Sequence, residues 1–178
     1  MKCWVFLFFF ITVTSIIAQE EVIPWSENRK LTWRDFKGTP NYNSVAAAIT
    51  ASGISYEFSA SVKGNQVFVD YKVNSYFYPQ NSWYNKEHGT LTVLKHEQLH
   101  FDITELHARK MRKILQNTTF TTKVKKQIKR VYNNIIKELQ QMQAQYDAET
   151  DHSRNAEAQQ KWEAKIAIMM KETRSLSQ

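Results

Sequence analysis

The amino-acid sequence predicts an α+β fold, in which a small antiparallel sheet is followed by about three helices. Two observations predict it. Between residues 20 and 89, apolar side chains alternate with polar ones, which is the period of a half-buried strand. From residue 90 onward, apolar side chains recur every three or four residues, which is the period of a helix that packs on one face. A strand-bearing segment followed by a helical one is typical of the α+β class.

The first 18 residues predict a secretory signal peptide. Lys2 precedes residues 3–18, which carry no charge and are rich in Phe, Ile and Val, and Ala18 ends the stretch. A short positive start, an apolar stretch and a small residue at its end are the features of a cleaved signal. The stretch is also short for a membrane span of about 20 residues. We therefore expect cleavage after Ala18, export to the periplasm or beyond the cell, and one mature domain over residues 19–178.

The strand-bearing segment predicts a hairpin of residues 52–62 and 66–77. Apolar and polar residues alternate in both segments, and Gly64 and Asn65 between them are typical of a turn. Residues 45–51 form either a further strand or the start of the first one.

Three helices are predicted after this hairpin. The first covers residues 91–115, which contain neither Gly nor Pro. The second starts near Thr121 and carries an apolar stripe that ends at Tyr146. Residues 147–153 break this periodicity, and the third helix starts near Asn155.

The first helix carries the pattern H-E-x-x-H, as His96, Glu97 and His100. Residues four apart lie on one face of a helix, so the two imidazoles can reach one tetrahedral Zn²⁺. Glu97 would project beside them as the general base of a metalloprotease. The pattern therefore predicts a zinc site with His96 and His100 as ligands and Glu97 as the catalytic residue.

Catalytic zinc usually takes three protein ligands, and the mature chain has no Cys to offer. His107 shares the helix face but lies about 10 Å further along the axis, so we expect it at the surface or behind a ligand. If the second helix runs antiparallel to the first, residue 152 falls near the level of the paired histidines. We expect His152 as the third ligand, with Asp147 or Glu149 as the alternative. His88 could reach the metal only by folding back.

The charge balance excludes few classes of protein. Lys and Arg outnumber Asp and Glu by 24 to 17, for a net charge of +7, and the excess lies mostly at residues 110–113 and 123–130. No nucleic-acid motif accompanies these residues, so no nucleic-acid partner is expected. A solvated helix face explains the pattern, and attraction to an anionic envelope surface is the alternative. The sequence predicts no stable protein partner.

Three segments carry a resemblance to a known family: residues 31–38, 96–109 and 146–153. They span nearly the whole mature chain, which resembles a bacterial family of unknown function whose members are described as predicted secreted zinc-dependent proteases. The resemblance implies a zincin-like domain with an active-site helix. The family pattern often has Gly where this chain has Leu99 and Ser153, and neither position is a proposed ligand.

These observations lead us to expect a secreted zinc-dependent peptidase. Zn²⁺ on the three histidines would activate a bound water, and Glu97 would take its proton. An edge of the predicted hairpin could align an extended peptide substrate. Three residues are open as donors to the developing oxyanion: Tyr84, Tyr146 and Arg109.

The alternative is a non-catalytic zinc-binding or interaction protein of the bacterial envelope. A closed site with four protein ligands would favour this alternative, because no coordination position would remain for water. The sequence does not select a substrate or an oligomeric state.

Overall fold

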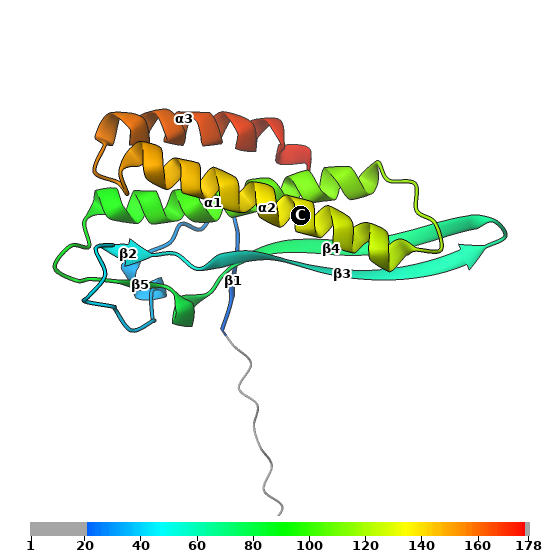
Figure 1. Cartoon of the computed structure of the whole chain (residues 1–178), viewed down its shortest axis with the longest axis horizontal. Helices are drawn as coiled ribbons and strands as arrows, with labels where there is room; N and C mark the ends of the chain where they lie inside the picture. Colours follow the sequence, from blue (N-terminus) through cyan, green and yellow to red (C-terminus); the bar gives the residue numbers. More distant parts are fainter. Residues whose placement is uncertain (1–20, 177–178) are drawn as a thin grey trace, which may run out of the picture.

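The computed structural model describes residues 21–176 and confirms the α+β fold (Figure 1). The predicted signal peptide lies outside these residues. One antiparallel sheet has the strand order β1-β4-β3, and a second, two-stranded sheet pairs β2 with β5. The strands are β1 (Ile23–Pro24), β2 (Ala48–Ile49), β3 (Ser52–Lys63), β4 (Gln66–Phe77) and β5 (Trp83–Tyr84). The helices are α1 (Leu91–Gln116), α2 (Val124–Thr150) and α3 (Ala156–Glu172), with short 3-10 turns at Trp33–Asp35, Pro79–Asn81 and Arg174–Leu176.

The hairpin of β3 and β4 forms as the alternation predicts. Its register runs from the pair Ser52 and Phe77 at the base to Lys63 and Gln66 at the tip. Gly64 turns the chain with φ of 61°, a conformation that Gly adopts without a steric penalty. The face that includes Ile54 and Val73 packs on the helices, because its side chains are the apolar half of the alternation. Residues 48–49, which the sequence left open, form a separate short strand.

Each helix begins close to its predicted start, and local side chains explain the differences. Thr90 caps α1 by accepting a hydrogen bond from the Val93 amide, and Asn155 caps α3 in the same way. The second helix begins at Val124, three residues after the predicted start. Its C-terminus extends to the buried Thr150, so the first residues of the predicted break belong to the helix.

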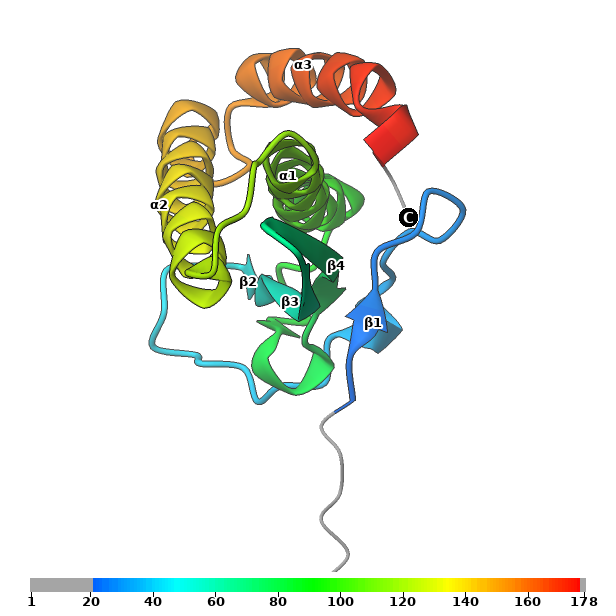
Figure 2. The same ribbon diagram turned by 90° about the vertical axis from the view of Figure 1, so that its right-hand side faces the viewer.

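Figure 2 looks along α1, which lies between α2, α3 and the hairpin. Because it is covered on several sides, α1 buries polar as well as apolar residues along its length, from His96 to Leu115. Its apolar residues form the main core with residues of both other helices and of the sheet, including Ile103, Met111, Ile128, Tyr146 and Trp162. No helix within residues 21–176 is both long and apolar enough to cross a membrane.

The buried charges of α1 form a network that ties the helix to the sheet. Glu105 accepts hydrogen bonds from Arg109 Nε and Arg112 Nη1, each at 2.9 Å, and from Ser75 Oγ of β4 at 2.6 Å. Arg112 also donates to the carbonyl of Val73. Glu105 points away from the paired histidines, as its position on the helix predicts, and it holds α1 in place against β4.

Candidate metal centre

The structure brings the two predicted histidines of α1 together on one face of the helix. His96 is 3% exposed and His100 is 7% exposed. Their Nε2 atoms lie 3.2 Å apart, and the rings are nearly perpendicular. Both nitrogens therefore face one point.

The third group at this point comes from α2. Asp147 Oδ1 lies 3.0 Å from His96 Nε2 and 2.9 Å from His100 Nε2. Within the described residues, His96, His100 and Asp147 are the group of ligand-type side chains whose atoms all lie within 4.8 Å of one another. They could hold a metal ion. The carboxylate alternative that the sequence left open is the one whose oxygen joins the two imidazoles.

The charges and hydrogen bonds among Asp147, His100 and His96 shift the pKa values of Asp147 and His100. Burial alone would raise the pKa of Asp147, but hydrogen bonds from His100 and His96 hold that pKa well below its usual range. Burial also opposes charge on His100, yet its hydrogen bond with Asp147 and the negative charge of Glu97 raise its pKa above the ordinary value. The site therefore favours a positive charge between these groups.

Two glutamines hold the imidazoles from behind. His96 Nδ1 lies 3.2 Å from Gln159 Oε1, and His100 Nδ1 lies 3.1 Å from Gln143 Oε1. The orientation of each amide is set because its nitrogen donates elsewhere, Gln159 to Glu163 and Gln143 to the carbonyl of His100. Each Nδ1 is therefore placed to donate a hydrogen to an amide oxygen. In the neutral ring, the Nε2 lone pair is then left facing the shared point.

Tyr146 supports the same arrangement. Its ring is fully buried and stacks on His96 with a centroid distance of 4.5 Å. Its hydroxyl donates to Gln159 Oε1 at 2.7 Å. Burial raises the pKa of this hydroxyl far above its usual value, so it remains a donor. Tyr146 thus lies behind His96, where it cannot reach a substrate oxyanion.

Glu97 lies in the same cleft as the two histidines. The cleft has a volume of about 210 Å³ and is lined by His96, Glu97, His100, Asp147 and His152, together with residues 46–50 of the β2 segment. Glu97 is 5% exposed. No residue between 21 and 176 donates a hydrogen bond to its carboxylate, whereas Thr50 donates to its main-chain carbonyl at 3.3 Å. The carboxylate is therefore available to accept a proton in the cleft.

His152 stands beside the group of three, at the mouth of the cleft. Its Nδ1 lies 3.7 Å from Asp147 Oδ1, and its side chain is 60% exposed. It is held there by an unusual backbone, because Asp151, His152 and Ser153 have φ values of 47°, 51° and 76°. A left-handed conformation costs an L-residue about 1–2 kcal/mol. Gly does not pay this cost, because it has no Cβ.

The other candidate ligands lie elsewhere. Glu149 accepts hydrogen bonds from Trp162 Nε1 and Gln145 Nε2, both at 2.7 Å, which hold it toward α3. His88 is exposed in the turn before α1.

The expectation of a surface position for His107 is wrong: it is buried, and its Nδ1 donates to the carbonyl of Ile103 at 2.9 Å. Burial lowers the pKa of His107.

Two of the three candidate oxyanion donors are also engaged in packing away from the cleft. Tyr84 stacks on Trp33 at a centroid distance of 4.3 Å. Arg109 is buried between Glu105, the carbonyl of Met170 and the ring of Trp25. Tyr146 lies behind His96, whereas His152 lines the cleft and its side chain is 60% exposed.

Sequence reasoning missed the two glutamines and the β2 segment. Gln143 lies four residues before Asp147, so both share one helix face, and a polar residue inside the apolar stripe of α2 was the available signal. Gln159 is 3% exposed, but no local pattern around it predicts this burial. Residues 46–50 reach the cleft through the pairing of β2 with β5, which only the fold reveals.

Comparison with known proteins gives one match. A family model described as "Bacterial protein of unknown function (DUF922)" matches residues 37–153, which contain the hairpin, both histidines of α1, Asp147 and His152. No curated protein and no solved structure matches the chain.

Proposed function

Since the chain belongs to the DUF922 family of bacterial proteins of unknown function, we propose an activity from its site alone: that it is an exported, zinc-dependent peptidase. The proposal rests on one observation. Two imidazole nitrogens and one carboxylate oxygen converge with separations of 2.9 to 3.2 Å, and the other nitrogen of each ring faces the amide oxygen of Gln143 or Gln159. Three such atoms at these distances fit a shared positive charge, such as a metal ion.

The donor set fits zinc. Zinc takes His nitrogen and carboxylate oxygen at about 2.0–2.2 Å, so neighbouring ligand atoms of a tetrahedral site lie about 3.3 Å apart. The three separations in this group, 2.9 to 3.2 Å, are close to that value. His96, His100 and Asp147 would hold the ion, and they leave the cleft side of the group open to Glu97. Three protein ligands with one open position are typical of catalytic rather than structural zinc.

The residues of the cleft then have distinct roles. A bound Zn²⁺ would lower the pKa of a water molecule toward neutrality and polarise a carbonyl group. Glu97 would accept the proton of the attacking water and pass it to the leaving amine. His152, at the cleft mouth, is the side chain placed to donate a hydrogen bond to the developing oxyanion.

The β2 segment would align the substrate, in place of the hairpin edge that the sequence suggested. No residue of β3 or β4 lines the cleft, whereas residues 46–50 form one of its walls. The segment pairs with β5 on one side, where Ala48 lies opposite Tyr84 and Ile49 opposite Trp83. An extended peptide could add to its other side by main-chain hydrogen bonds.

The first test is metal content. We expect the purified exported protein to bind one Zn²⁺ per chain, and His96→Ala and His100→Ala each to lower zinc affinity by roughly 10²-fold or more, because two remaining ligands bind far more weakly than three. His88→Ala is the matched control, since His88 is exposed and outside the cleft. Zinc is measured by plasma mass spectrometry and its affinity by competition with a chelating dye. Full zinc content in the double variant would disprove the site.

A second pair of variants separates Asp147 from His152 as the third ligand. We expect Asp147→Ala to lose about 10²-fold or more in zinc affinity. We expect His152→Ala to lose no more than roughly tenfold, the lower end of the range for residues that only support a ligand, because its imidazole lies beside the group and is largely solvated. The reverse order would identify His152 as the ligand, as the sequence suggested. Equal large losses would indicate four protein ligands and favour the non-catalytic zinc protein of the envelope.

A further inference from the structure

The end of the molecule remote from the metal centre combines two unusual surface features. The first is the tip of the long hairpin. Figure 1 shows β3 and β4 projecting beyond the ends of α1 and α2, so that both faces of the tip meet solvent. Val62, on the helix-facing side, is 60% exposed, and Phe68, on the opposite side, is 49% exposed. Lys63 at the turn lies over the Phe68 ring, with Nζ 5.8 Å from its centroid.

The second feature is a segregation of charge. Residues 106–137, which form the second half of α1, the connection and the first half of α2, contain ten Lys and Arg and no Asp or Glu. The rest of the chain has 14 basic and 17 acidic residues, so the whole positive excess of the protein comes from this stretch. Charge segregated in this way gives one part of the surface a positive electrostatic potential.

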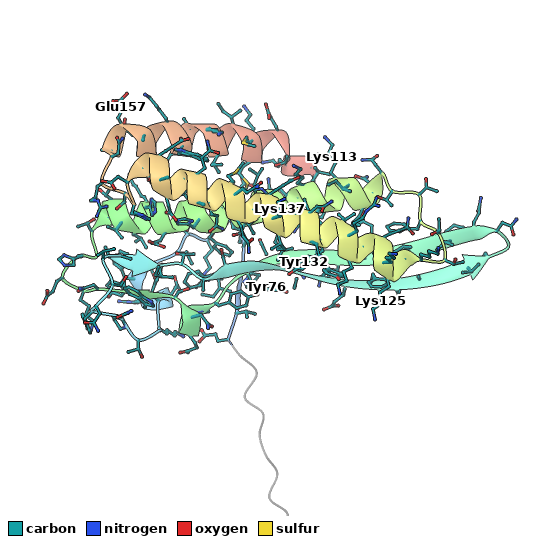
Figure 3. All side chains as sticks on the ribbon, in the orientation of Figure 1. Tyr76, Lys113, Lys125, Tyr132, Lys137 and Glu157 are labelled. Atoms are coloured by element: carbon teal, nitrogen blue, oxygen red, sulfur yellow. The ribbon has the colours of Figure 1, made fainter. Side chains whose placement is uncertain are left out.

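Most of these cations are not neutralised by the protein. Arg109 and Arg112 are engaged with Glu105, and Lys110 pairs with Glu138 at 2.5 Å. The other seven are exposed and form no ion pair with any residue in the described range 21–176: Lys113, Lys123, Lys125, Lys126, Lys129, Arg130 and Lys137. Figure 3 shows Lys113 and Lys125 at the hairpin end of the helices.

The acidic residues of the hairpin do not cancel this field. Glu57 lies directly opposite Lys72 in the neighbouring strand, which offsets its charge. Asp70 lies opposite Ser59, so it is the single acidic group of the hairpin without a basic partner across the strands. The hairpin end therefore presents an apolar tip beside a strongly positive surface.

We propose that this end of the protein docks on membranes rich in anionic lipid. The hairpin tip, Val62 to Phe68, would enter the headgroup region, and the lysines at the start of α2 would contact the anionic headgroups. Exposed aromatic and aliphatic side chains next to clustered lysines are the combination that gives peripheral proteins their affinity for such surfaces. Nucleic acid fits less well, because the tip offers apolar insertion rather than a groove.

The test is vesicle sedimentation with the exported form of the protein, from which the apolar residues 3–18 have been removed. We expect binding to vesicles of equal parts phosphatidylglycerol and phosphatidylcholine, and none to pure phosphatidylcholine. Salt should weaken the binding, since screening acts on exposed charges. Lys125→Ser combined with Lys126→Ser should lower affinity by roughly 25-fold, or about fivefold for each lysine. Phe68→Ser should lower affinity further and leave the salt dependence unchanged.

The matched control is Lys86→Ser combined with Lys161→Ser, which removes the same charge elsewhere. Lys86 lies in the connection before α1, which Figure 1 shows at the end of the molecule opposite the hairpin tip. Lys161 pairs with Glu157, which Figure 3 labels at that same end. Equal weakening by the control pair, or equal binding to both kinds of vesicle, would overturn the proposal. Binding to heparin or DNA without binding to anionic vesicles would also overturn it. His96→Ala should bind vesicles as the wild type does, so this proposal and the zinc proposal can fail separately.

Discussion

Glu97→Gln is expected to lower the rate of peptide cleavage by roughly 10²-fold or more, the scale expected when a general base is removed. The amide has nearly the size of the carboxylate but cannot accept a proton. Zinc content should stay at one per chain, because Glu97 is not among the three converging ligand groups. The fold should also persist, since no residue in the described part of the chain bonds to the Glu97 carboxylate.

The measurement needs a substrate, which a broad peptide library screened with the zinc-loaded protein can supply. Initial rates are then compared for the wild type, Glu97→Gln and the control Glu87→Gln, whose side chain is exposed before α1. The control should cleave at the wild-type rate. Cleavage by Glu97→Gln at the wild-type rate would exclude this carboxylate as the base, and with it the proposed mechanism.

Glu105→Ala is expected to lower the free energy of unfolding by about 3–5 kcal/mol, far more than the loss of an exposed ion pair. The change leaves the guanidinium groups of Arg109 and Arg112 without their carboxylate, and the Arg109 side chain is only 2% exposed. An uncompensated buried charge is costly because neither water nor protein neutralises it. Urea denaturation followed by circular dichroism gives the free energy directly.

Glu138→Ala is the matched control for Glu105→Ala. Glu138 forms an ion pair with Lys110, but both side chains are about half exposed. Exposed pairs contribute about 0–1 kcal/mol because solvent screens them. Comparable losses in the two variants would mean that the Glu105 network is not buried as described, and that α1 is held by its apolar contacts alone.

The sequence was sufficient for the fold class and for half of the candidate site. The hairpin and the three helices follow from the spacing of apolar residues, and the bounds of β4 were predicted without error. His96, Glu97 and His100 share a cleft because their spacing within one helix sets their positions, whatever the rest of the chain does. The prediction of the two histidines and Glu97 therefore needed only local information.

The positions of Asp147 and Gln159 depend on how α1, α2 and α3 pack together. The local sequence around each residue does not predict this packing. The choice between Asp147 and His152 turned on where α2 ends. The periodicity breaks at residue 147, but the helix continues to Thr150, whose hydroxyl bonds the carbonyl of Tyr146 at 2.6 Å. Asp147 is consequently a helical residue that faces α1. Gln159 joins the site through the packing of α3, at a distance of 63 residues from His96 in the chain.

The left-handed run of Asp151, His152 and Ser153 has a consequence for how this protein can evolve. Left-handed backbone is accessible mainly to Gly, and then to Asn and Asp, whereas β-branched residues are strongly disfavoured there. Few residue types are therefore compatible with the backbone of residues 151–153, whatever their chemical role. Invariance of a Gly at position 153 in a set of relatives would therefore be explained by backbone geometry without any catalytic role.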